Sequence, residues 1–134
     1  MIYAVIDTNV FVSALLSRHP DSATVQVVNE ILKNGICPLY NHEIINEYQD
    51  VLHRDKFHFP SAAIDYIIST IQELGIISER ISSSEIFPDP NDVVFYEVAL
   101  SKDAAYLVTG NTKHFPQTPI VVTPAEMMEI IKTK

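Results

Sequence analysis

The chain has 134 residues, of which 47% are hydrophobic, 19% are charged and only three are glycine. This composition excludes a disordered tail, a collagen-like repeat and an acidic linker, since none of these buries enough apolar surface to form a core. A chain of this length is expected to form one domain, spanning residues 1–134, with its own hydrophobic core. The formal net charge is −8, so the sequence lacks the broad basic face typical of proteins that bind duplex DNA.

Cysteine content and hydropathy limit the class of protein further. The single cysteine, Cys37, can form no disulfide within the chain and no cysteine-based zinc site, and it is expected to be a small core residue. The N-terminus has no basic segment and its apolar run is too short for a signal peptide. No stretch approaches the roughly 18 apolar residues that span a bilayer. We therefore expect a soluble cytoplasmic domain with no membrane contact.

Short apolar runs typical of strands alternate with periodic segments typical of helices, which predicts a parallel α/β sheet. In chain order the predicted elements are a strand at Tyr3–Ile6, helices at Val10–Leu16 and Ala23–Lys33, a strand at Ile36–Leu39, helices at Glu43–Leu52 and Ala62–Leu74, a strand near Ile76–Ile77, a helix at Val93–Ser101, strands at Tyr106–Thr109 and Ile120–Val122, and a helix at Ala125–Lys132.

Three residues mark expected helix ends. Gly35 and Gly75 follow predicted helices at positions where a left-handed glycine is common, and Pro124 is expected to open the last helix. The segment Arg54–Pro60 interrupts the helical pattern and is predicted to be an exposed loop or hinge. The only local cluster of basic residues is interleaved there with Phe57 and Phe59, and it consists of His53, Arg54, Lys56 and His58. This mixture suits single-stranded nucleic acid or a protein partner equally well.

Polar residues stand just beyond two of the predicted strands. Asp7-Thr8-Asn9 follows the first strand, and Gly110-Asn111-Thr112 follows the fourth. Parallel sheets bind ligands beyond the C-terminal ends of their strands, where the strand order reverses. Asp7 is therefore a candidate site residue, although capping of the next helix explains it equally well. Asn111 could likewise complete a turn.

Glu47 lies in a helix whose apolar residues define one face. With Ile44 at zero and about 100° per residue, those residues cover an arc from about 340° to about 100°. Glu47 lies near 300°, on the border of this arc, whereas Glu43 and Asp50 lie near 260° and 240°, well outside it. Glu47 can lean toward the sheet edge, although a solvated surface position is the more common outcome.

Asp92 directly precedes the helix Val93–Ser101, which is apolar on nearly all sides and is expected to be buried. An acid at the start of a buried helix either caps that helix or presents its charge in a cleft. Asp89 lies between two prolines and is predicted to be a turn residue, with support of a metal as the alternative. Lys113 and His114 are either an exposed loop pair or contacts for a phosphate.

Taken together, these residues resemble the PIN-domain family of metal-dependent ribonucleases, over essentially the whole chain. Small single-domain members that act as toxins of type II toxin–antitoxin systems are the most similar. The likeness rests on Asp7-Thr8-Asn9 after the first strand, on a mid-chain helix carrying Glu47, on Asp89-Pro90-Asn91-Asp92-Val93-Val94-Phe95 followed by Ala99, and on Leu107-Val108-Thr109-Gly110-Asn111-Thr112-Lys113-His114-Phe115.

The resemblance implies a three-layer α/β/α PIN-like fold, with a central, mostly parallel twisted sheet of about five strands flanked by helices. It also implies an acidic pocket that holds one or two Mg²⁺ or Mn²⁺ ions. Asp7, Glu47 and Asp92 match the acidic ligands of the family, and Thr8 matches a supporting hydroxyl. Both ions prefer oxygen ligands, so carboxylates suit them. Asn9 and Thr109 are further supporting candidates.

The chain departs from the family at one position. Many members have a fourth acid where this chain has Asn111. An amide oxygen can orient a ligand or a water, so Asn111 remains a catalytic candidate, but it adds no charge. A second metal site would then need the carboxylate of Asp89.

The leading hypothesis is an endoribonuclease that hydrolyses RNA phosphodiester bonds with a metal-activated water. The resemblance further implies single-stranded or loop RNA as substrate, a small antitoxin partner and a homodimer. The alternative is a non-catalytic, degenerate PIN-like module that binds RNA or protein. A phosphotransfer domain is disfavoured because no Asp-x-Asp follows the first strand, and a nucleotide-binding module because Gly-x-Gly-x-x-Gly and the P-loop are absent.

Overall fold

The computed structural model describes the whole chain, residues 1–134. At its centre is a five-stranded sheet in which all neighbouring strands are parallel, in the order β3-β2-β1-β4-β5. The strands are β1 (Ile2–Ile6), β2 (Ile36–Tyr40), β3 (Ile76–Ile77), β4 (Tyr106–Val108) and β5 (Val121–Val122). The chain builds outward from β1 to β3 and then resumes on the other side of β1 with β4. The strand order therefore reverses between β1 and β4.

Six helices and three short 3-10 turns connect these strands, and every predicted strand and helix is present. The helices are α1 (Thr8–Leu16), α2 (Ala23–Leu32), α3 (His42–Leu52), α4 (Ser61–Leu74), α5 (Val93–Ala99) and α6 (Pro124–Lys132). The 3-10 turns are Asp55–Phe57, Pro90–Asp92 and Thr112–His114.

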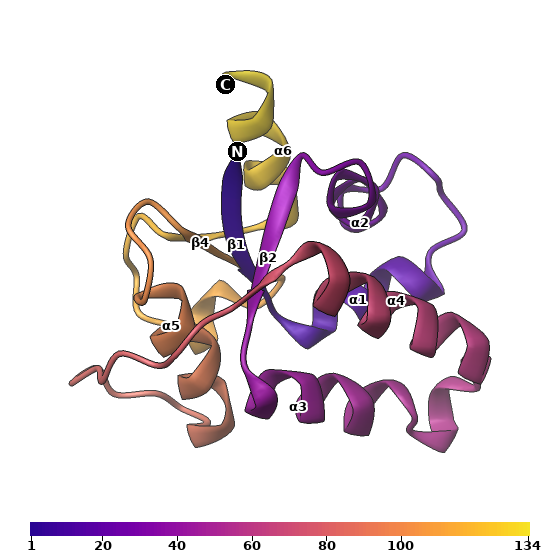
Figure 1. The fold of residues 1–134 in the computed structure, drawn as a ribbon, viewed down its shortest axis with the longest axis horizontal. Coiled ribbons are helices and arrows are strands. Elements are labelled where there is room, and N and C mark those ends of the chain that lie inside the picture. Colours follow the sequence, from indigo (N-terminus) through magenta and orange to yellow (C-terminus); the bar gives the residue numbers. More distant parts are fainter.

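Helices cover both faces of the sheet (Figure 1). Helix α5 packs against β1, β2 and β4 on one side, whereas α2 and α4 pack against β2 on the other. The inner residues of β1, Ala4, Val5 and Ile6, are 0% exposed, as expected for a central strand covered on both faces. This arrangement confirms the predicted three-layer α/β/α fold.

The two chain termini lie together at one end of the molecule, and α3 lies at the opposite end (Figure 1). Strand β1 runs from the terminal end toward α1 and α3. Because all strands are parallel, the C-terminal ends of the whole sheet meet at the α3 end. Any residue that directly follows a strand therefore lies at that edge of the sheet.

The prediction of left-handed glycines was wrong at both positions, since no glycine has a positive φ. Asn34 takes the left-handed conformation after α2, with φ of 63°, and leaves Gly35 in an ordinary one. Gly75 is needed for space, because a Cβ there would lie 2.3 Å from the Pro38 carbonyl oxygen and 2.5 Å from that of Ile71. Pro124 opens α6, as predicted, within a capping box formed by Thr123 and Glu126.

The segment 78–89 contains no helix or strand, yet it is tied to two helices. The Arg80 guanidinium contacts Glu43 of α3 at 2.9 Å and Glu97 of α5 at 2.7 Å. Glu97 also accepts a hydrogen bond from the Ser83 backbone N–H at 2.7 Å. These contacts hold an irregular segment in place over the sheet edge. None of the helices has both the length and the apolar character that crossing a bilayer requires.

Candidate functional site

The candidate site lies at the C-terminal edge of the sheet, where the strand order reverses between β1 and β4. Asp7 follows β1 there, and its backbone N–H donates to the Val108 carbonyl of β4 at 2.9 Å. Loops that leave neighbouring strands in opposite directions open a crevice at such a point. The fold thus places the first predicted acid at the position where an α/β sheet binds ligands.

Asp7 is only 6% exposed and is held by a residue far away in the chain. The Thr109 hydroxyl donates to Asp7 Oδ2 at 2.8 Å and accepts the Asn111 backbone N–H at 3.0 Å. Asp7 occupies the N-cap position of α1, but its side chain makes no capping hydrogen bond. Burial raises the pKa of Asp7, and the Thr109 hydrogen bond opposes that rise. The Asp7 carboxylate is therefore fixed toward β4 rather than used as a cap.

Asp92 ends the turn before α5 and also makes no capping hydrogen bond. Its Oδ2 atom is buried without a hydrogen-bond partner, and the nearest cationic group is His114 Nδ1 at 3.6 Å. Burial raises the pKa of Asp92 to about 6, with a further contribution from the charges of Asp7 and Asp89. A buried carboxylate oxygen without a hydrogen bond is costly, and Asp92 does not cap its helix, so capping does not account for it.

Glu47 is half-buried on α3, as its border position on the helix predicted. Burial raises its pKa, and the charges of Asp50, Asp7 and Asp89 raise it further. Arg54, about two helical turns further along the chain, opposes this rise. Glu43 and Asp50 are exposed, in agreement with their predicted solvated positions.

These side chains meet in one pocket of about 220 Å³, here called the acidic pocket. It brings together most of the predicted site residues and several side chains that were not predicted for it. Its lining comprises Asp7, Thr8, Asn9, Glu47, Val51, Arg54, Asp89, Asn91, Asp92, Phe95 and His114. The charges of Asp7 and Asp89 raise the pKa of both Glu47 and Asp92, so these acids lie within electrostatic reach of one another.

Two predicted residues are placed differently from the rest. Asn111 does not line the acidic pocket but a neighbouring hollow of about 270 Å³, which Asn9 also lines. Asp89 is exposed, and its Oδ1 accepts the Asn91 backbone N–H at 2.9 Å, which bears out its prediction as a turn residue. The acids with buried or half-buried side chains are therefore Asp7, Glu47 and Asp92.

The oxygen-rich lining can be compared with the needs of a hard divalent cation. No group of three or more Asp, Glu, His or Cys side chains is close enough together to hold one ion. Mg²⁺, however, often uses only one or two carboxylates and keeps several waters. Asp92 Oδ2 and Thr8 Oγ1 are buried oxygens without a hydrogen-bond partner, so both have lone pairs free for a cation or its waters. The donor set fits Mg²⁺ or Mn²⁺ on these grounds.

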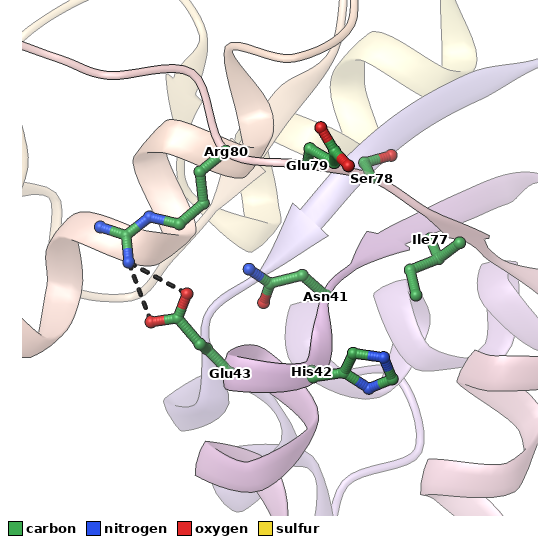
Figure 2. Close-up of a pocket in the computed structure, with 7 residues that line it drawn as sticks. All are labelled: Asn41, His42, Glu43, Ile77, Ser78, Glu79 and Arg80. Carbon is green, nitrogen blue, oxygen red and sulfur yellow. Dashed lines mark hydrogen bonds and ion pairs between the residues drawn. The ribbon is translucent and has the colours of Figure 1, made fainter.

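The largest hollow, of about 690 Å³, lies along the same sheet edge, beyond β2 and β3 (Figure 2). In it the Arg80 head reaches across to both carboxylate oxygens of Glu43, while Asn41 and His42 form the floor beside them. Arg80 is fully engaged by acids, so this hollow offers no free cation to an anionic ligand. A smaller hollow of about 160 Å³, lined by Glu47 and Arg80, lies between it and the acidic pocket.

Two features of the site were missed or left open by the sequence. The pairing of His114 with Asp92 joins residues from different loops, and no local pattern indicates it. The sequence indicates Arg54 only as part of a basic cluster. Arg54 lines the acidic pocket because α3 ends at Leu52, next to the pocket, and the chain continues from there. Because α3 ends at Leu52, no helical spacing from Glu47 indicates that place.

Comparison with known proteins gives one family. A family model described as PIN domain matches residues 3–113, which is most of the chain. A search of curated proteins and a search of solved structures each returned no match. The matched range includes every residue that lines the acidic pocket except His114.

Proposed function

The chain belongs to the PIN-domain family, whose members are generally nucleases, and from that premise we propose that it is a Mg²⁺- or Mn²⁺-dependent endoribonuclease. The observation that carries this proposal is the acidic pocket. Asp7, Glu47 and Asp92 come from three different parts of the chain and line one pocket at the sheet edge where the strand order reverses, and the charge of Asp7 raises the pKa of the other two. Structural carboxylates are normally paired, whereas none of these three makes a direct ion pair with a lysine or arginine.

In the proposed site one or two of the three acids would bind the metal directly and the others would act through its waters, and each acid is held in place by a different part of the fold. Thr109 fixes the Asp7 carboxylate, the α5 N-terminus presents Asp92, and α3 presents Glu47. The free Thr8 hydroxyl can orient a water, and Asp89 can add a carboxylate at the rim. A bound metal would supply an activated water and positive charge against the phosphate. No covalent nucleophile from the protein is needed.

Asn111 has a narrower role in this proposal than the sequence suggested. Its side chain lines the neighbouring hollow, which shares only Asn9 with the acidic pocket. We assign Asn111 to the orientation of substrate or water rather than to metal binding. Residues 1–134 would act as a single PIN-like domain.

Cleavage of an end-labelled mixed RNA pool tests the proposal directly. We expect products with Mn²⁺, none with EDTA, and none with Asp7→Asn, which removes the charge and keeps the side-chain shape. Asp65→Asn, an exposed carboxylate on α4, is the matched control and should cleave as the wild type does. Wild-type activity in Asp7→Asn would refute the assignment.

A second candidate, the non-catalytic PIN-like module, has two observations in its favour. No three acids are close enough to hold an ion, and Asn111 replaces the acid that many family members have. Metal binding separates the two functions. A competent site should gain about 2.7 kcal/mol of unfolding free energy at a metal concentration 100 times its Kd. A degenerate site should show almost no gain and no cleavage.

The family resemblance supports three finer statements within this proposal: that the nuclease is a toxin, that a small antitoxin restrains it, and that it forms a homodimer. Induced expression in bacteria should then arrest growth, and Asp7→Asn should relieve the arrest. Growth arrest by both proteins, or by neither, would argue against a toxin. Analytical ultracentrifugation of the purified protein would show whether it is a monomer or a dimer.

A further inference from the structure

An acidic pocket poses an electrostatic problem for a nuclease, because it repels the phosphates that it must receive. The protein as a whole carries a formal charge of −8, which adds to the repulsion. Positive charge beside the pocket is therefore needed to hold the strand. Two side chains that can carry such charge line the pocket, Arg54 and His114, and His114 already lies against Asp92.

Arg54 is the second residue of the connection between α3 and α4, residues 53–60, here called the connecting loop. The loop carries His53, Arg54, Lys56 and His58, all of them exposed or half-buried, and its only acid is Asp55. Through Arg54 the loop reaches the acidic pocket itself, where Arg54 lowers the pKa of Glu47. The turn Thr112–His114 also carries exposed basic residues, Lys113 and His114, and reaches the pocket through His114, but His114 already lies against Asp92, so the connecting loop is the better candidate.

Arg54 is available to an incoming anion, in contrast to Arg80. Its one ion pair is with Asp50 of α3, at 3.5 Å, and the two side chains are 50% and 72% exposed. An exposed pair of this kind is worth at most about 1 kcal/mol, so a phosphate can displace it. Arg80 instead contacts two carboxylates, one of them on the buried Glu97.

The loop has the rigidity that a binding surface needs. Residues Asp55–Phe57 form a 3-10 turn, and His58 closes it in the left-handed region with φ of 55°. The rings of Phe57 and Phe59 stack on each other at 5.2 Å with an interplanar angle of 9°, and Lys56 Nζ lies 5.1 Å from the Phe57 centroid. Because both rings are half-buried and face each other, they hold the loop in shape and do not form an open platform for bases.

We propose that Arg54 and Lys56 of the connecting loop bind the phosphate backbone of single-stranded RNA and lead it into the acidic pocket. This inference rests on the proposed ribonuclease function and names the surface that receives its substrate. A single strand is favoured over a duplex for two reasons. Asp7 is recessed, at 6% exposed, so the phosphate must bend inward to reach it. Two cations on one loop also fall far short of the basic face that a duplex requires.

Salt-dependent RNA binding tests the proposal without cleavage. The affinity of the full-length protein for a fluorescein-labelled single-stranded RNA of mixed sequence is measured by anisotropy, in EDTA, from about 50 to 200 mM salt. For each phosphate that the protein no longer neutralises, the slope of log K against log salt should become shallower by about 0.7, hence by about 1.4 for the pair Arg54→Gln and Lys56→Gln. At the lowest salt the paired variant should bind about tenfold more weakly.

Two further variants give the measurement its controls. Lys132→Gln removes an exposed, ion-paired lysine from α6, at the opposite end of the molecule from α3, and should leave the slope unchanged (Figure 1). Arg54→Lys keeps the charge and should keep the wild-type slope. Equal slopes in the wild type and the paired variant would overturn the proposal, as would a wild type that does not bind RNA; the loop would then serve an acidic protein partner or none.

The outcomes also separate this inference from the proposed function. If the wild type cleaves RNA and the loop variants bind RNA normally, the ribonuclease proposal is supported and the role of the connecting loop is refuted. Loop-dependent binding without any cleavage in Mn²⁺ would support the loop surface and favour the non-catalytic module.

Discussion

Burial of the Asp92 carboxylate in the acidic pocket lowers the free energy of unfolding of the protein. Its Oδ2 atom is buried without a hydrogen bond, and its pKa is raised from 3.8 to about 6 by burial and by the charges of Asp7 and Asp89. The folded state therefore holds the Asp92 proton more tightly than the unfolded state does. By linkage, stability is lost as the pH rises through this interval, and the full cost is present above about pH 6.

Asp92→Asn should therefore stabilise the metal-free protein at pH 7.5. We expect the free energy of unfolding to increase by ~1 to 3 kcal/mol, because the amide carries no charge to be buried unpaired. The gain should vanish near pH 4, where the wild-type carboxyl is protonated. Thermal unfolding in EDTA at both pH values measures this, with exposed Asp65→Asn as the control. A variant less stable than the wild type at both pH values would contradict the argument.

Thr109 is a positioning residue whose hydroxyl joins two parts of the site. It is 0% exposed, donates to Asp7 and accepts from the Asn111 backbone. Thr109→Val should cost ~1 to 3 kcal/mol of stability, because it leaves two polar groups without their partner. It should also raise the pKa of Asp7 further, since the hydrogen bond that it removes lowers that pKa.

That second effect distinguishes positioning from mere packing. Mn²⁺ binding needs an ionised Asp7, so in Thr109→Val the rise of Mn²⁺ affinity with pH should be shifted to higher pH. Calorimetric titrations across the pH range measure the shift. Thr109→Ser keeps the hydroxyl and should restore the wild-type profile, whereas a profile unchanged in the valine variant would show that the hydroxyl does not tune Asp7.

At the scale of elements, segment 78–89 shows how irregular chain is held by charge. Glu97 is buried in α5, where it accepts hydrogen bonds from Ser83 N and Arg80 Nε and carries the ion pair to Arg80. The pKa of Glu97 is lowered, first by the Ser83 backbone N–H and then by Arg80. A lowered carboxyl pKa means that this stabilisation is present above the usual value of 4.5 and is lost as the pH falls through the folded-state value.

Glu97→Gln should therefore destabilise the protein at pH 7 and much less in acid. We expect a loss of ~1 to 3 kcal/mol at pH 7, since charged hydrogen bonds become neutral ones. Urea denaturation at pH 7 and below pH 4 gives the comparison. Glu43→Gln removes only the exposed partner of Arg80 and should cost less than about 1 kcal/mol. Equal losses at both pH values would show that Glu97 acts by packing alone.

Helices and strands could be predicted from local patterns, but their exact ends could not. Apolar runs located β1 and β2 because central parallel strands are buried on both faces. The expected left-handed glycine after α2 failed because Asn34, one residue earlier, tolerates that conformation and ends the helix first. Gly75 is required because a side chain there would collide with the backbone of Pro38 in β2. This close approach depends on tertiary packing, which no local pattern reveals.

At the scale of the whole molecule, the topology explains why the acidic pocket could be located from the sequence. Asp7 and Asp92 stand at element ends, and a parallel sheet collects such positions at one edge. What the sequence could not supply are contacts between distant segments, such as the hydrogen bond between Thr109 and Asp7 and the pairing of His114 with Asp92. The same limit explains Asn111, whose side chain lines the next hollow although its backbone is tied to Thr109.

The family match ends at residue 113, yet the fold continues beyond it. Strand β5 extends the sheet beside β4, and α6 packs against α2 with Met127 at 0% exposed. If residues 1–134 form one cooperative domain, a cavity under α6 must destabilise the distant sheet core as well. All six tyrosines lie outside α6, so their fluorescence reports on the rest of the molecule.

Met127→Ala should therefore cost ~2 to 5 kcal/mol, because it leaves a cavity between α6 and α2. Urea unfolding is followed by tyrosine fluorescence and by far-ultraviolet circular dichroism, and both transitions should move together to lower urea. Met128→Ala, at a half-buried neighbouring position, should cost less. A fluorescence transition that stays in place while the dichroism changes would mean that α6 unfolds separately, and that the region of the family match is stable without it.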